Sequence, residues 1–144
     1  VFTDCSSNEI GKGNVVADGT DIAIFATGIT VASAVKARAA LADKGVSAAV
    51  VDIHTIKPFD KELANYYASR CGVILTAEEH SVIGGLGSAV AEAVCESGKC
   101  VPVVRLGVND EFGKSGPAVQ LLHEYGLDAA NIVAKCKAAV ELKK

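Results

Sequence analysis

The sequence predicts a three-layer α/β/α domain built on a mostly parallel sheet of about five strands. Short apolar runs alternate with helical stretches, which is the pattern of βαβ units. The runs are continuously apolar, as expected of parallel strands that helices cover on both faces. Half of the residues are hydrophobic, but there are only four Phe, three Tyr and no Trp. This aromatic-poor composition favours close packing of helices on a sheet over a β-sandwich.

Four strands follow from the apolar runs, and the first of them is expected to be central in the sheet. They are expected at residues 21–27, 46–54, 72–77 and 101–108. Before them, within a leading segment 1–19, residues 10–19 can add a short edge strand, parallel or antiparallel. The length of 144 residues fits one domain, so residues 1–144 are taken as a single unit.

Helical stretches are expected between and after these strands. The first covers residues 31–44, a second follows Asp60, a third opens in the glycine-rich turn at residues 84–87, and two close the chain. Four residues are of the types that cap a helix N-terminus and stand where a helix is expected to begin. They are Thr30, Asp60, Ser115 and Asp128.

The composition argues against several classes of function. The net charge of −3 and the sequence pI near 5.6 give no electrostatic reason to bind nucleic acid or an anionic membrane. No apolar run approaches the roughly 20 residues of a membrane span. The five cysteines are odd in number and none has C-x-x-C spacing, which argues against a disulfide framework and a zinc site. Free thiols in a reducing cytosol, and hence a cytoplasmic location, are the expectation.

The first residues do not read as the start of a protein. They are Val1-Phe2-Thr3-Asp4, with no initiator Met, no basic region and no signal-like apolar core. We therefore expect the chain to be a fragment, or the ordered part, of a longer protein.

Two glycine-containing stretches partly match phosphate-binding motifs. Residues 85–90 nearly read G-x-G-x-x-G, the dinucleotide-binding fingerprint, but Val90 replaces the third glycine. Residues 113–115 read G-K-S between a strand and a helix, but the first glycine of a P-loop is missing and two acids, Asp110 and Glu111, precede them. We interpret the first stretch as a turn that packs a helix closely on the sheet, and we assign no nucleotide site to the second.

The end of the third apolar strand carries a candidate site. Glu78, Glu79 and His80 stand there, at the edge where open α/β sheets bind ligands. Two acids beside an imidazole can do general acid–base work, but no nucleophile, metal ligand or oxyanion donor is identifiable nearby. The favoured interpretation is a hydrogen-bonded loop that shapes an interface, with a buried His80 bonded to a carboxylate.

A second loop of interest follows the first strand. Thr27 and Gly28 precede a helix start, where backbone N–H groups can hold an anion; a simple turn with Gly28 in a permissive conformation is the alternative. The two loops together define a candidate interface or anion site. Its residues are Thr27, Gly28, Glu79, His80, Ser81, Gly84 and Gly85.

Five segments, in this order and at this spacing, together resemble the C-terminal domain of the transketolase family across nearly the whole chain. They read T-D-I-A-I-F-A-T-G (20–28), D-I-H-T-I-K-P-F-D (52–60), E-E-H-S-V-I-G-G-L-G-S-A-V (78–90), F-G-K-S-G (112–116) and Y-G-L-D-A-A-N-I (125–132). The third and fourth look most like transketolase itself, especially the bacterial type split over two polypeptides. The alternatives within the family are 1-deoxyxylulose-5-phosphate synthase and then the β subunits of 2-oxoacid dehydrogenases.

The resemblance implies a parent enzyme that uses thiamine diphosphate and Mg²⁺ to transfer a two-carbon ketol unit between sugar phosphates in the pentose phosphate pathway. In the family the cofactor lies between a diphosphate-binding and a pyrimidine-binding domain. These domains are the implied partners, in a homodimer or a split heterotetramer. The family's G-D-G motif is absent; the nearest string, Ala17-Asp18-Gly19, lacks the first glycine. No catalytic, cofactor-binding or metal residue is therefore assigned here, and the isolated domain is expected to be inactive.

Two further classes of protein stay open on the residues alone. One is a free-standing Rossmann-like module that binds an anion or a nucleotide through the strand ends at Gly28 and His80. The other is a small hydrolase with His80 as base, which is disfavoured because the chain has no G-x-S-x-G elbow. A fold shared by many functions cannot decide among these classes, so it is the ordered segments that favour the transketolase domain.

Overall fold

The computed structural model describes residues 8–143. Within them, five strands form one sheet in the order β1–β3–β2–β4–β5. The strands are β1 (Asn14–Ala17), β2 (Ile22–Ala26), β3 (Ala48–Asp52), β4 (Ile74–Ser81) and β5 (Val103–Val108). β1 runs antiparallel to β3 at one edge, within the segment where an edge strand is expected, and the other pairings are parallel. The predicted fold class and the central place of the first apolar run are confirmed.

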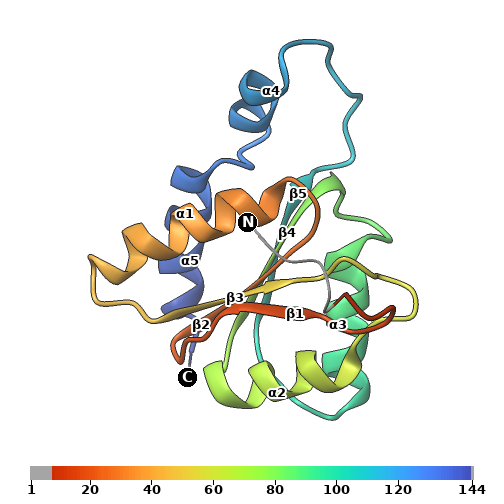
Figure 1. The fold of residues 1–144 in the computed structure, drawn as a ribbon, viewed down its shortest axis with the longest axis vertical. Helices are drawn as coiled ribbons and strands as arrows, with labels where there is room; N and C mark the ends of the chain where they lie inside the picture. The colour runs from red at the N-terminus through yellow and green to blue at the C-terminus, as the bar shows by residue number, and fades with distance from the viewer. Residues whose placement is uncertain (1–7, 144) are drawn as a thin grey trace.

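Helices cover both faces of the sheet (Figure 1). They are α1 (Thr30–Ala42), α2 (Lys61–Cys71), α3 (Leu86–Glu96), α4 (Ala118–Glu124) and α5 (Ala129–Val140). α1 and α5 pack on one face and α2 and α3 on the other, so the sheet separates two apolar cores. The short helix α4 stands apart from the sheet in Figure 1 and has no buried residue.

The central strand β2 shows why the apolar runs specify this fold. All five of its side chains are fully buried. Because successive side chains of a strand point to opposite faces, Ile22 and Ile24 enter the core under α1 and α5, whereas Phe25 enters the core under α2 and α3. Burying one such large side chain stabilises the fold by roughly 1.5–3 kcal/mol. Only a strand that helices cover on both faces can bury every one of its side chains.

Two of the four expected helix caps are confirmed and two are wrong. The Asp60 carboxylate accepts a hydrogen bond from the Leu63 N–H (3.1 Å), and Asp128 caps α5 in the same way. Thr30 instead lies inside α1, because its buried hydroxyl turns to the neighbouring strand and donates to the Ala77 carbonyl (2.7 Å). Ser115 lies too early to cap α4, which begins only after Pro117.

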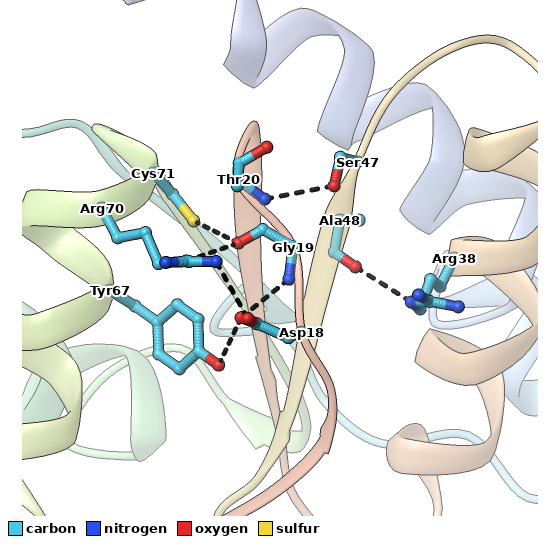
Figure 2. A network of polar contacts seen from close by, with 9 residues as sticks. All are labelled: Asp18, Gly19, Thr20, Arg38, Ser47, Ala48, Tyr67, Arg70 and Cys71. Carbon is cyan, nitrogen blue, oxygen red and sulfur yellow. Dashed lines mark hydrogen bonds and ion pairs between the residues drawn. The ribbon is translucent and has the colours of Figure 1, made fainter.

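A polar network joins the turn before β2 to the C-terminal end of α2 (Figure 2). The Asp18 carboxylate accepts hydrogen bonds from the Gly19 N–H (2.9 Å), the Tyr67 hydroxyl (3.1 Å) and the Arg70 guanidinium (2.9 Å). Arg70 also donates to the Gly19 carbonyl (3.2 Å). The backbone hydrogen bond from Gly19, and then Tyr67, lower the pKa of Asp18. Burial first, and then Asp18, raise the pKa of Tyr67 to about 12.

The cysteines behave as ordinary free thiols. Cys71, Cys95, Cys100 and Cys136 are free, and burial raises the pKa of the Cys136 thiol to about 12, which keeps it protonated. Cys5 lies outside the described residues. Among the helices of residues 8–143, none has the length and apolar character that crossing a membrane requires.

We predict that Gly19→Ala destabilises the domain. A Cβ at residue 19 would lie 2.3 Å from the backbone carbon of Ala48 and from the backbone nitrogen of Ala49. Because backbone atoms of β3, which is paired on both sides, cannot move aside cheaply, we expect a loss of about 1–3 kcal/mol in the free energy of unfolding. Denaturant unfolding followed by circular dichroism measures it. The control is Gly113→Ala, where a Cβ meets nothing within 4 Å; equal midpoints for the two variants would contradict the prediction.

Candidate functional site at the carboxyl edge of the sheet

The four parallel strands β2, β3, β4 and β5 end at one edge of the sheet, and the loops that follow them lie there together. This is the edge where open α/β sheets place their ligands. The loops are 27–29 after β2, 53–60 after β3, 82–85 after β4 and 109–117 after β5. The candidate residues named from the sequence all lie in the first and third loops or in the end of β4.

β4 is longer than the sequence predicts. Its expected end is residue 77, but the strand continues to Ser81, which pairs with Val108 after an irregularity in the ladder. The Val82 N–H then donates to the Val108 carbonyl (3.0 Å). The paired acids and the histidine therefore belong to a strand and not to a loop. The strand is buried through Glu78, exposed at Glu79 and His80, and half-buried at Ser81.

Glu78 is the buried polar group that organises this edge. Its side chain is fully buried, and its two carboxylate oxygens accept hydrogen bonds from the backbone N–H groups of Leu86 (2.7 Å) and Gly87 (2.9 Å). These N–H groups belong to the first turn of α3, where no intrahelical partner exists. A negative charge is stabilised there by the helix dipole. Glu78 thus caps α3 from the neighbouring strand.

The glycines at the start of α3 allow the helix to lie close to β4 and β5. A Cβ on Gly85 would lie 1.9 Å from the Glu78 Oε2 atom, and a Cβ on Gly87 would lie 2.7 Å from the Arg105 side chain and 2.9 Å from the Thr76 hydroxyl. A phosphate bound at this helix start would have to displace the Glu78 carboxylate. The geometry therefore favours a packing role for the glycine turn over a nucleotide site.

His80 lies in a different environment from the one expected. Its side chain is exposed, and its Nδ1 atom lies 3.1 Å from the Ser81 carbonyl. Within residues 8–143 it has no carboxylate partner at hydrogen-bond or salt-bridge distance. The expectation of a buried His80 bonded to a carboxylate is wrong, because β4 at this point has passed beyond the buried part of the sheet. Glu78, and not His80, fixes the shape of the edge.

A cavity of about 330 Å³ opens between these strand ends. It brings together Thr27, Gly28, Glu79, His80, Gly84 and Gly85 from the predicted set. Ser81 does not line it. Two lining residues, Ile29 and Ile56, were missed by the sequence interpretation. Glu78 was named there as a possible acid or base, but its role as a buried helix cap was missed. The available signal was one acid at the end of an apolar strand, eight residues before the start of a glycine-rich helix.

The arrangement does not fit the chemistry of thiamine diphosphate. A diphosphate with its metal needs cations and oxygen ligands, whereas this cavity is lined by two carboxylates and, among the described residues, by no Lys or Arg. Residues 8–143 contain no group of three or more His, Cys, Asp or Glu side chains that could hold a metal ion. We derive no reaction step at this edge.

The loops of the carboxyl edge expose large apolar side chains. After each of the four parallel strands one such residue stands in the loop: Ile29 (44% exposed), Ile56 (37%), Ile83 (62%) and Phe112 (98%). Single exposed apolar residues are common on any protein. Two of them, Ile29 and Ile56, line the same cavity, and exposed apolar side chains that lie together are typical of a surface that another protein covers.

The fold and its edge define an α/β domain with an apolar, acid-lined carboxyl edge and, within the described residues, no assembled catalytic centre. The chain belongs to the family described as "Transketolase, C-terminal domain", whose model matches residues 11–132.

Individual relatives agree with this membership. A provisionally assigned transketolase C-terminal section of Methanocaldococcus jannaschii is 44% identical over 88% of this chain and 39% of its own length. A 1-deoxy-D-xylulose-5-phosphate synthase of Geobacter sulfurreducens is 44% identical over 93% of this chain and 21% of its own length. A solved structure, described as "Split gene transketolase, inactive beta4 tetramer", superposes with a TM-score of 0.90 at 48% identity, over 95% of this chain and 45% of that one. The chain thus spans less than half the length of these proteins.

We predict that Glu78→Gln destabilises the domain. A glutamine has one acceptor oxygen, so either the Leu86 or the Gly87 N–H would face a buried amide N–H₂. Leaving one buried group unsatisfied costs about 1–3 kcal/mol. Denaturant unfolding gives the loss, and hydrogen exchange of the Leu86 and Gly87 amides localises it. Glu79→Gln is the matched control, because that side chain is exposed; a loss of the same size for both variants would show that the buried cap is unimportant.

Proposed function

We propose that the chain is the C-terminal domain of a thiamine-diphosphate-dependent transketolase, which transfers a two-carbon ketol unit between sugar phosphates. The domain itself supports assembly and carries no chemistry. The family match over residues 11–132 supports the first statement. The observation that carries the second is the carboxyl edge, where a buried acid caps a helix and the exposed Ile29 and Ile56 line the same cavity. Thiamine diphosphate and Mg²⁺ are then held by other parts of the parent enzyme.

The proposed domain comprises residues 1–144, with the leading segment 1–19 contributing the edge strand. Its partners are the pyrimidine-binding and diphosphate-binding domains of the parent, in a homodimer or in an assembly of split subunits in the cytoplasm. The similar solved structure is described as a split-gene transketolase in a tetramer, which supports an oligomeric parent. A role in the pentose phosphate pathway follows from the proposed reaction.

Within this proposal the candidate residues form an interface and not an anion site. Thr27 and Gly28 lie beside Glu79, His80, Gly84 and Gly85 around one cavity. The helix N-terminus nearest to the glycine turn is already occupied by the Glu78 carboxylate. An added anion would meet two negative side chains, which disfavour it electrostatically. A docked protein surface can instead bury the apolar side chains of the same loops.

A second candidate is the C-terminal domain of a 1-deoxy-D-xylulose-5-phosphate synthase, because such a relative is as similar, at 44% identity, as the transketolase section. The full-length protein that contains this chain separates the two. We propose that it forms a new ketose phosphate from a ketose phosphate donor and an aldose phosphate acceptor. Formation of 1-deoxy-D-xylulose 5-phosphate with no ketol transfer would favour the second candidate.

We predict that the isolated chain does not bind thiamine diphosphate. The G-D-G string is missing from the sequence, and the cavity at the carboxyl edge is acidic. Calorimetric titration of the chain with thiamine diphosphate and Mg²⁺ should give no heat of binding, while the full-length protein should bind. A micromolar dissociation constant for the isolated chain would refute the statement that the domain takes no part in binding the cofactor.

We also predict that His80→Ala in the full-length protein weakens assembly more than it slows chemistry. His80 is exposed at the edge of the cavity, so its removal should leave the stability of the isolated chain unchanged. Sedimentation velocity and thermal unfolding report assembly, and single-turnover kinetics reports the chemical step. A fall of about a hundredfold in the single-turnover rate, with assembly intact, would be the loss expected of a general acid or base and would make His80 catalytic.

A further inference from the structure

The cavity at the carboxyl edge combines a negative interior with apolar walls. Its volume of about 330 Å³ lies at the lower end of the range of ligand pockets, which suits a single side chain. Ile29 and Ile56 contribute apolar surface, and Glu78 and Glu79 contribute carboxylates. No Lys or Arg of the described chain lines it. An occupant with an apolar stem and a positive end matches both features.

The Glu78 and Glu79 carboxylates differ in whether their oxygens are still free to accept a hydrogen bond from an occupant. Both oxygens of Glu78 already accept N–H groups of α3. Glu79 is exposed and makes no ion pair or side-chain hydrogen bond with the rest of residues 8–143. Lys57 and Lys61 line a neighbouring groove and not this cavity, and the Lys61 ammonium pairs with Glu96 at 2.6 Å. Among residues 8–143, Glu79 is therefore an acceptor without a partner.

The surroundings indicate that the occupant belongs to a protein surface. Ile29 and Ile56, which line the cavity, are 44% and 37% exposed, and Ile83, which precedes the lining Gly84 in the chain, is 62% exposed. A free small cation would leave these side chains in water. A folded surface that carries one basic side chain would cover them and fill the cavity at the same time.

We propose that an arginine or lysine side chain of the parent's pyrimidine-binding domain enters this cavity and pairs with Glu79. The inference rests on the proposed function, in which that domain is a partner of this one, and it adds that the two meet at the carboxyl edge. The apolar side chains around the cavity exclude water when the two surfaces meet, and a charge pair without water is stronger than one at an open surface. Such a pair fixes the orientation of the docked surface, because a wrong register leaves both charges unpaired.

Hydrogen exchange in the full-length protein tests the proposal. We expect residues 78–88 to exchange at least about tenfold more slowly in the full-length protein than in the isolated chain, because a covered segment must open before it exchanges. Glu79→Lys in the full-length protein should return these rates to those of the isolated chain, and Glu79→Gln should do so in part. The matched control is Glu141→Gln, an exposed acid after α5, which should leave the protection unchanged.

Each of the other possible results contradicts either the inference or the proposed function, as follows. Protection that survives Glu79→Lys would mean that the edge is covered without a cation, so the inference would be wrong while the proposed assembly role stands. Equal exchange in the full-length protein and the isolated chain would show an uncovered edge, which contradicts both. A dimer of the isolated chain that Glu79→Lys dissociates would identify a second copy as the occupant. If residues 78–88 are protected and Glu79→Lys removes the protection, but the full-length protein transfers no ketol unit, only the proposed reaction would be wrong.

Discussion

The carboxylate of Glu78 fixes the position of α3 against the end of β4, and much of the carboxyl edge depends on this contact. A buried carboxylate is unfavourable unless it is hydrogen-bonded, and two N–H groups of α3 at 2.7 and 2.9 Å provide the bonds. The contact leaves no room for a side chain at Gly85, where a Cβ would lie 1.9 Å from the carboxylate. β5 also passes close to this end of β4, because a Cβ at Gly107 would lie 2.7 Å from the His80 carbonyl and 3.1 Å from the Glu78 Cγ atom.

The acidic side chains at the two ends of the sheet differ in whether they have partners within the domain. At the amino end, the Asp18 carboxylate is paired inside the chain by Tyr67 and Arg70. At the carboxyl end, Glu79 has no such partner among residues 8–143 and stands beside exposed apolar side chains. Because Tyr67 and Arg70 already pair with Asp18, the acid at the amino end has partners within the domain. The second end keeps its charge and its apolar surface available, which is what a binding edge requires.

The sheet could be predicted from the sequence because its information is local and periodic. Apolar runs gave four strands, and Asp60 and Asp128 gave true helix caps. The errors arose where a side chain acts across elements. The Thr30 hydroxyl bonds to Ala77, 47 residues away, instead of capping its own helix. Glu78 was expected only as a possible acid or base, and His80 was expected to be buried, because nothing in a local pattern shows that β4 extends to Ser81 and that its acid meets α3.

The same contact makes this edge a poor site for a phosphate. In open α/β folds, a helix N-terminus at the carboxyl end of a parallel strand is a ready anion site, because its N–H groups lack partners. Here the chain supplies its own anion, so the N–H groups are satisfied and the positive end of the helix dipole is compensated. What remains at the surface is the opposite of a phosphate site. The Glu79 carboxylate, which has no partner among residues 8–143, lies with the apolar Ile29 and Ile56 around one cavity. Because the anion site is filled from within, we propose that this edge binds a basic, apolar protein surface and not an anionic ligand.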